Sequence, residues 1–199
     1  VKIAEAFAYA SASLGAKTVI SIMKPMRQSS EEPPKPIGEA MKASDVVLMP
    51  TTKSLTHTEA RREATEQGAR IASMPGITEE MMSIGGLTAD YNDIANRTIK
   101  VAEILEKGKS VEITTPSGTK LTMDIEGRTP KRDTGLYHKS GEWGNLPAGE
   151  ACLAPIEETA QGTLVIDKMG KTVRQKLTVT IKNGWAQRFQ GPDANRLEG

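Results

Sequence analysis

The chain has 199 residues and a net charge of +1, from 26 basic and 25 acidic side chains. Hydrophobic residues make up 37% of it, and 18 glycines add to a composition that is typical of a globular protein and excludes disorder, collagen and a disulfide scaffold. The balanced charge and the 4% aromatic content give no case for binding nucleic acid or an anionic membrane. The single cysteine, Cys152, favours the cytoplasm, and no apolar run approaches the roughly 20 residues of a membrane span.

Both ends of the sequence indicate a piece of a longer enzyme. Val1 leads directly into apolar residues at helical spacing, which continue to Leu14 before Gly15. This segment has neither the basic start nor the cleavage site of a secretory signal. The last residues, Asn195 to Gly199, provide no obvious closing element. We therefore expect that catalysis needs segments outside this sequence.

The first half of the chain predicts alternating helices and strands. Apolar runs predict strands over residues 18–23, 45–49 and 70–74. Thr56 and Glu59 form a capping-box pattern that predicts the start of a helix, and Thr78 and Thr88 are expected to cap two more. Strands separated by helices of this length form parallel βαβ units. Residues 1–107 therefore predict a doubly wound α/β domain with a parallel sheet.

From residue 108 onward the pattern changes to β-hairpins. Strands are predicted over residues 111–114 and 120–125, around the turn-forming residues 116–119. Two more are predicted over residues 163–166 and 177–181. The dipeptide Asn183-Gly184 is typical of a type I′ hairpin turn, and residues 127–149 are rich in loop-forming glycines. Residues 108–199 therefore predict a mostly antiparallel β domain.

Few side chains in this sequence carry an obvious chemistry. No glycine-rich nucleotide motif follows any predicted strand. His57 follows a strand end, where open α/β sheets bind ligands, but we favour an exposed residue at the start of a helix. His138 lies in the glycine-rich loop and carries little information alone. Cys152 is expected to be a buried strand thiol rather than a nucleophile.

Glu150 is the most informative carboxylate, because a proline- and glycine-containing loop precedes it and an apolar segment follows it. A carboxylate held in this way suits a hard divalent metal ion. The pattern alone still favours a solvated loop glutamate over a metal ligand.

A family resemblance changes this balance. The stretch 145–157, Asn-Leu-Pro-Ala-Gly-Glu-Ala-Cys-Leu-Ala-Pro-Ile-Glu, with Gly162 and Asp167 after it, resembles the metal-dependent aminopeptidases of the aminopeptidase T and aminopeptidase S type. Upstream, His57-Thr58-x-Ala60-Arg61, Gly127-Arg128 and Asp133-x-Gly135 are similar to a leucyl aminopeptidase-like branch. The resemblance implies an incomplete thermophilic-metalloprotease-like fold in a cytoplasmic homo-oligomer, such as a dimer.

The resemblance also implies a hydrolytic function. It makes Glu150 a metal ligand in a two-metal site that removes N-terminal residues from peptide substrates, with Zn, Co or Mn as the metal in the intact parent. The family's other ligands find no match before Gly199, so the catalytic residues stay unidentified. We therefore expect an inactive portion of a metalloaminopeptidase, which can lack a bound metal because it supplies only one ligand.

Two alternatives remain open. The same superfamily resembles a non-haem iron enzyme that opens dihydroxypyridine rings, so the parent enzyme can instead be a ring-cleaving dioxygenase. The chain can also be a non-catalytic oligomerisation module whose β half pairs with a second copy.

Overall fold

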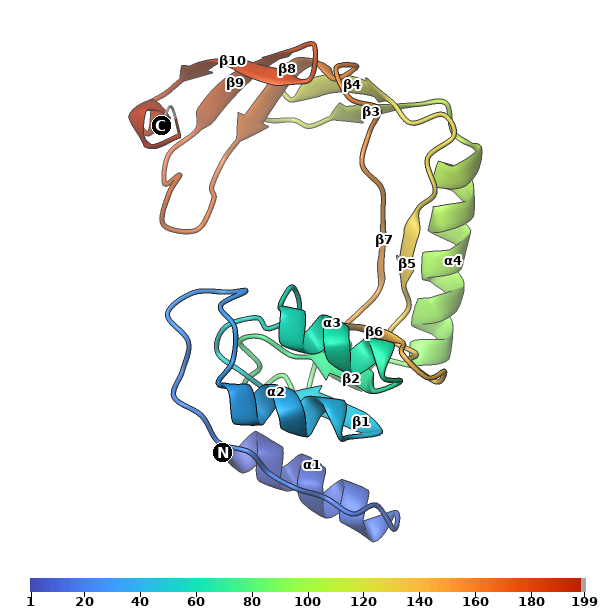
Figure 1. The fold of residues 1–199 in the computed structure, drawn as a ribbon. Coiled ribbons are helices and arrows are strands. Elements are labelled where there is room, and N and C mark those ends of the chain that lie inside the picture. The colour runs from blue at the N-terminus through green and yellow to red at the C-terminus, as the bar shows by residue number, and fades with distance from the viewer. Residues whose placement is uncertain (198–199) are drawn as a thin grey trace. The chain divides into compact units, whose positions relative to one another are not determined.

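The computed structural model describes residues 1–197, and the chain divides into two compact units (Figure 1). The first unit combines Val1–Thr98 with Asp133–Glu150, and the second combines Ile99–Arg132 with the residues from Ala151 onward. This division differs from a single break near residue 107, because residues 133–150 belong to the first unit. Glu198 and Gly199, the end of the predicted β domain, lie outside the described residues.

The first unit is a small parallel sheet with helices. Its elements are α1 (Lys2–Ser13), α2 (Lys35–Lys42), β1 (Val46–Met49), α3 (Glu59–Glu66), β2 (Arg70–Ser73), the 3₁₀ helix η1 (Gly86–Thr88), the start of α4 (Tyr91–Lys107) and β6 (Trp143–Asn145). The strands lie in the order β1-β2-β6, and both pairings are parallel. The strands expected around residues 45–49 and 70–74 are thus confirmed, whereas β6 falls within the stretch expected to be a loop.

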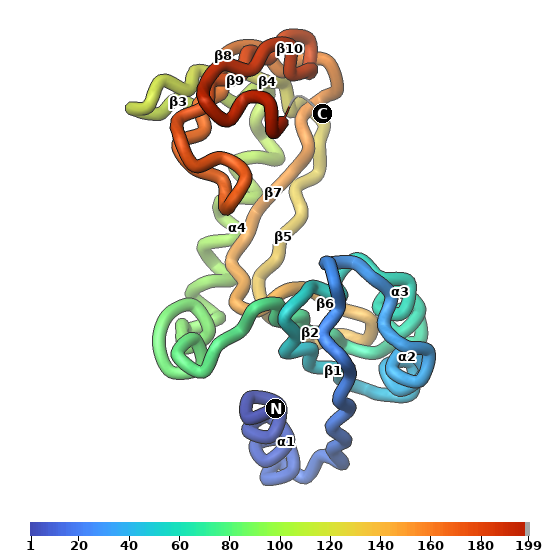
Figure 2. Tube along the Cα trace, turned by 90° about the vertical axis from the view of Figure 1, so that its left-hand side faces the viewer, coloured from blue at the N-terminus to red at the C-terminus, as the bar shows by residue number. Residues whose placement is uncertain are grey.

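The two faces of this sheet have different environments. Side chains alternate between faces along a strand, and paired residues of neighbouring strands share a face. Met49 and Ile71 lie on the face that packs against α2 and α3. They share a buried core with Ala60 and Ala64 of α3. In Figures 1 and 2, α2 and α3 lie together on one side of the sheet and α1 lies on the other.

Two local predictions in the first unit are wrong. Residues 18–23 form no strand, and Val19 and Ile22 are exposed, because no neighbouring strand supplies the ladder of hydrogen bonds that a strand requires. The predicted helix after Thr78 is a series of turns that ends in η1. Both segments have apolar residues at suitable spacing, but tertiary partners decide whether such residues form regular structure.

Helix α4 begins later than its predicted cap. Asp90, rather than Thr88, accepts the first free amide, from Asn92 at 2.8 Å. The helix begins in the first unit and ends in the second.

Among residues 1–197, no helix combines the length and the hydrophobicity required to cross a bilayer.

The second unit is an antiparallel sheet. Its elements are the last part of α4, β3 (Ser110–Thr114), β4 (Lys120–Asp124), β8 (Gln161–Ile166), β9 (Leu177–Lys182), β10 (Trp185–Gln190) and the 3₁₀ helix η2 (Ala194–Arg196). The strand order is β10-β9-β8-β4-β3. Asn183 and Gly184 have φ angles of 51° and 76°, as the predicted type I′ turn requires. Val173, Leu177 and Val179 form the buried core of this unit.

Besides α4, two short strands cross from one unit to the other. These are β5 (Lys131–Asp133) and β7 (Glu150–Cys152), which pair only with each other among the described strands.

Candidate functional site

A partly buried polar cluster lies at the carboxyl ends of β2 and β6. It consists of Ser54, Thr56, Ser73 and Asn145, of which Ser73 and Asn145 are the last residues of their strands. The Thr56 Oγ1 atom is 2.9 Å from both Ser73 Oγ and Asn145 Oδ1, and it accepts a hydrogen bond from Ser54 Oγ at 2.7 Å. Ligands of open parallel sheets bind at this edge, so the cluster marks a candidate site.

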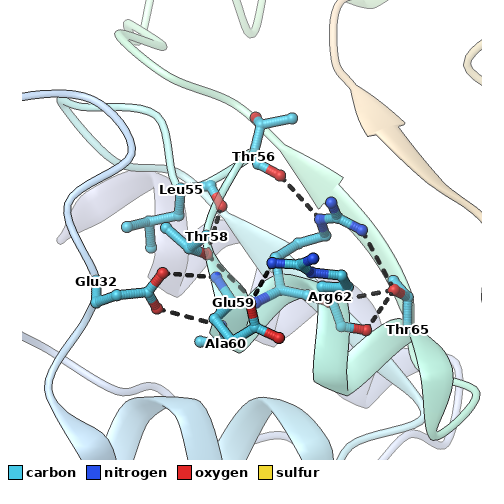
Figure 3. Close-up of polar contacts among 9 residues, drawn as sticks. Glu32, Leu55, Thr56, Thr58, Glu59, Ala60, Arg62 and Thr65 are labelled. Carbon is cyan, nitrogen blue, oxygen red and sulfur yellow. Dashed lines mark hydrogen bonds and ion pairs between the residues drawn. The ribbon is translucent and has the colours of Figure 1, made fainter.

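The segment before α3, which contains Thr56, leads into a helix whose first turn is capped by side chains. Thr58, rather than Thr56, is the N-cap, and its hydroxyl accepts a hydrogen bond from the Arg61 amide at 3.2 Å. The Glu32 carboxylate accepts from the amides of Glu59 and Ala60 at 2.6 and 3.2 Å, as Figure 3 shows. A carboxylate at this end also matches the positive end of the helix dipole. The predicted capping box is therefore wrong, and the Thr56 hydroxyl is left to join the polar cluster.

Arg61 connects α3 to β6. Its side chain donates from Nε to the Thr56 carbonyl at 2.8 Å and from one terminal nitrogen to Thr65 Oγ1 at 3.3 Å. The guanidinium carbon lies 3.8 Å from the centroid of the Trp143 ring, a cation–π geometry. Burial lowers the pKa of Arg61 from its ordinary value, but a guanidinium keeps its charge in proteins.

His57 stands beside this pair on the solvent side. Its ring meets the Trp143 ring edge-on, with centroids 6.4 Å apart and an interplanar angle of 86°. The residue is exposed, as the favoured interpretation expects, but its neighbours Thr56 and Thr58 are both buried and hydrogen-bonded. An exposed imidazole on a fixed backbone is suited to accept or donate a proton.

Asp133 and Tyr137 form hydrogen bonds with the backbone of β6. The Tyr137 hydroxyl lies 2.6 Å from Asp133 Oδ1 and 2.8 Å from the Asn145 carbonyl oxygen. Burial, followed by the hydrogen bond to Asp133, raises the pKa of Tyr137 well above its ordinary value. A Cβ at Gly144 would collide with the Tyr137 hydroxyl and with Asp133 Oδ1, so the close approach requires a glycine.

A cavity of about 330 Å³ lies on the sheet face that α1 covers. The ends of all three strands contribute to it through Leu48, Met74 and Leu146. The remaining lining residues are Phe7, Met82, Leu87, Tyr91 and Gly135. Its volume is at the low end of the range of about 300 to 1,000 Å³ that is usual for small-molecule sites. Among the described residues that line it, none is charged.

The residues predicted from the sequence lie apart from one another. Glu150 begins β7 and is exposed, and its role as a metal ligand stays a prediction. Cys152 is exposed, so the expected buried thiol is wrong because β7 is a short two-stranded ribbon rather than a core strand. His138 lies exposed in the loop before β6 and contributes to neither the polar cluster nor the cavity.

The described residues do not fit a metal centre by themselves. Between Val1 and Leu197, no three His, Cys, Asp or Glu side chains lie close enough together to hold a metal ion. We therefore assign no reaction step to a metal held by these residues.

Several residues of the sequence motifs instead have structural partners in the second unit. Arg128 forms an ion pair with Glu157, and a backbone hydrogen bond and then this arginine lower the pKa of Glu157. Asp167 accepts a hydrogen bond from Ser117 Oγ at 2.5 Å, which joins the turn between β3 and β4 to the end of β8.

The sequence pattern does not predict that the polar cluster forms, and it does not single out Tyr91. Ser73 and Asn145 each end a strand, but β6 has only three residues and leaves no periodic signal. The position of Ser73 directly before Met74-Pro75 was the available signal, because a polar residue at the end of a buried strand faces the ligand-binding edge.

Comparisons with known proteins identify the family. The family model described as 2,5-dihydroxypyridine 5,6-dioxygenase (NicX) matches residues 1–198. The 2,5-dihydroxypyridine 5,6-dioxygenase of Pseudomonas putida is 22% identical over 159 residues, which cover 76% of this chain and 43% of the relative. The solved structure of 2,5-dihydroxypyridine dioxygenase from the same bacterium matches with a TM-score of 0.66 and 21% identity, covering 81% of this chain and 47% of the other.

These findings overturn the aminopeptidase interpretation. The expected metalloprotease, hydrolase and peptide-substrate assignments rested on short motifs around Glu150, whereas the family model matches nearly the whole chain. Related folds host different chemistries, so a short shared motif does not determine the reaction. The chain spans less than half the length of the curated relative that it matches. It belongs to the 2,5-dihydroxypyridine 5,6-dioxygenase (NicX) family.

Proposed function

We propose that this chain is part of a dioxygenase that opens the ring of a hydroxylated pyridine, with 2,5-dihydroxypyridine as the first substrate to test. The family match over residues 1–198 carries this proposal. The candidate site supports it, because hydroxyl and amide groups gathered at the carboxyl edge of a parallel sheet suit a small ring that carries hydroxyl groups.

His57 is the residue of this chain that we assign to proton transfer. Its imidazole is exposed at the carboxyl edge of the sheet, next to the buried Thr56. Accepting the proton of a ring hydroxyl would make the ring richer in electrons and therefore easier to oxidise. The role of the polar cluster is then to hold the backbone that carries His57 in one position.

The reaction also implies a metal in the complete protein. Non-haem Fe(II) with open coordination positions is a common centre of oxygenases, so we propose iron rather than zinc, cobalt or manganese. Because residues 1–197 provide no group of three suitable donors, the proposal gives this chain the protein surface around the ring and no ligand set of its own.

The decisive experiment measures oxygen uptake and ring loss together. The complete protein encoded around this chain is loaded anaerobically with Fe(II) and mixed with 2,5-dihydroxypyridine in aerated buffer. We expect one molecule of oxygen consumed per ring lost, and no release of leucine from a leucyl peptide. Peptide hydrolysis, or the absence of oxygen uptake with every dihydroxypyridine isomer, would overturn the proposal.

Location and assembly belong to the same proposal. We propose a cytoplasmic enzyme, which its single cysteine supports. We also propose a homo-oligomer, which light scattering on the purified protein tests directly.

A further inference from the structure

The motif His57-Thr58-x-Ala60-Arg61 places a cation four residues after the exposed imidazole. Because Thr58 caps α3, Arg61 stands in the first turn of the helix, and its side chain turns back toward the segment before the helix. Its Nε donates to the Thr56 carbonyl at 2.8 Å, and this carbonyl belongs to the peptide unit that joins Thr56 to His57. Arg61 therefore holds the backbone directly at His57.

Packing, rather than a hydrogen bond, orients the imidazole of His57. Among residues 1–197, neither ring nitrogen of His57 has a hydrogen-bond partner, whereas the ring meets Trp143 edge-on. A general base is usually oriented by a third group that hydrogen-bonds to it. In this site the Trp143 ring takes that role, so the position of the imidazole depends on what holds Trp143.

Arg61 covers one face of the Trp143 ring, with its guanidinium carbon 3.8 Å from the ring centroid. The arginine is only 9% exposed, and within the described part of the chain it forms no ion pair, whereas the adjacent Arg62 pairs with Glu59. Burying a charge without an ion pair is unfavourable, and an apolar side chain of similar volume is often at least as stable in such a place. The stability of the first unit therefore does not explain an arginine at this position.

We infer that Arg61 is a positioning residue for His57, because it fixes both the peptide unit before the imidazole and the Trp143 ring beside it. A guanidinium can make both contacts at once through its Nε–H and its planar face, whereas the ammonium group of a lysine offers no plane. Misplacing a catalytic group by about 1 Å can lower a rate by about 10²-fold. The effect on catalysis rests on the proposed role of His57 in proton transfer, but the coupling of Arg61 to the imidazole does not.

The test compares Arg61→Met with Arg62→Met in the complete, iron-loaded protein. Methionine keeps an unbranched side chain that packs on Trp143, but it cannot donate a hydrogen bond to the Thr56 carbonyl. We expect Arg61→Met to lower the kcat of ring opening about tenfold to hundredfold and to change KM by less than about threefold. Its unfolding temperature should stay close to that of the unchanged protein. Arg62→Met is the matched control and should leave kcat unchanged, because Arg62 is exposed and pairs with Glu59 on the surface of α3.

A second readout follows the imidazole itself, by NMR of the metal-free protein with isotope-labelled histidine. The His57 signal is the one that disappears in His57→Gln, and the neighbouring Trp143 ring displaces it from the position of a free imidazole. We expect Arg61→Met to move this signal toward that of free histidine and Arg62→Met to leave it in place. Arg61→Lys keeps the charge and is the milder change, so it should move the signal in the same direction by a smaller amount.

The inference is overturned by an unmoved His57 signal in folded Arg61→Met and Arg61→Lys variants, or by an unchanged kcat in both. A kcat that falls only in proportion to the folded fraction, measured by circular dichroism, would also overturn it, because Arg61 would then have a structural role alone. If the complete protein opens no dihydroxypyridine, the proposed function alone fails, since the NMR signal still measures the coupling of Arg61 to His57.

Discussion

Thr56 and Asn145 are 89 residues apart in the sequence, yet Thr56 Oγ1 lies 2.9 Å from Asn145 Oδ1. This contact joins the loop before α3 to the last residue of β6, and Ser73 at the end of β2 completes it. The carboxyl edge of the sheet is therefore held by side-chain hydrogen bonds as well as by the ladder. The same contact fixes the residue directly before His57.

Thr56→Val should destabilise the first unit by about 1–3 kcal/mol, because it preserves the volume but leaves the buried Ser73 and the half-buried Asn145 without their partner. Urea unfolding followed by Trp143 fluorescence in a Trp185→Phe background measures the change. The control is Thr52→Val at an exposed loop position, where we expect a change within about 0.5 kcal/mol. Equal stability of the two variants would show that the cluster contributes nothing.

Gly144→Ala should destabilise the same unit by about 1–3 kcal/mol, because the added methyl group pushes against the Tyr137 hydroxyl and Asp133. Thermal unfolding by circular dichroism is the measurement. Gly38→Ala in α2 is the matched control, since its Cβ would meet Ala60 Cβ at an ordinary 3.4 Å and alanine favours the helix. If both variants unfold at the same temperature, Tyr137 and Asp133 leave enough room for a Cβ at position 144.

Much of the fold follows from local pattern. The strands β1 and β2, the β3–β4 hairpin and the Asn183-Gly184 turn are readable because each has a buried or alternating run bounded by turn residues. β6 is not readable, since Trp143-Gly144-Asn145 is too short to show a period and joins the sheet only through pairing with β2. The residues 18–23 show the reverse case, a strand-like run that forms no strand because it pairs with none of the described strands.

The candidate site was less predictable than the fold. Thr56 fits a capping box as well as Thr58 fits an N-cap, and only the tertiary contact with Asn145 decides between them. The motif around Glu150 contains a single exposed carboxylate, whereas the polar cluster is built from residues scattered between Ser54 and Asn145. Spatial convergence of this kind is not visible in the spacing of residues along one chain.

Asp193→Asn should make the second unit less stable at neutral pH and reduce its sensitivity to acid. Backbone amides of Arg174 and Gln175 donate to the Asp193 carboxylate at 2.8 and 3.1 Å, and they lower its pKa. The folded unit therefore binds fewer protons than the unfolded chain, so this stabilisation is present above the ordinary Asp pKa of about 3.9 and is lost as the pH falls below it.

Trp185 fluorescence in a Trp143→Phe background follows the unfolding of the second unit between neutral and acidic pH. Asp124→Asn, an exposed carboxylate on β4, is the control and should leave the pH dependence unchanged. An Asp193→Asn variant that loses stability on acidification as steeply as the parent would contradict the assignment.

His57→Gln should lower the kcat of ring opening by about 10²–10⁴ in the complete, iron-loaded protein, with a much smaller effect on KM. Glutamine keeps a polar side chain of similar length beside Trp143, but it cannot accept the proton of a ring hydroxyl. His138→Gln is the matched control, because that histidine is exposed and lies in the loop before β6. We measure oxygen uptake against substrate concentration for the three proteins and compare their unfolding curves, so that a structural defect is recognised. A His57→Gln variant with an unchanged kcat and parental stability would remove His57 from the proposed proton transfer.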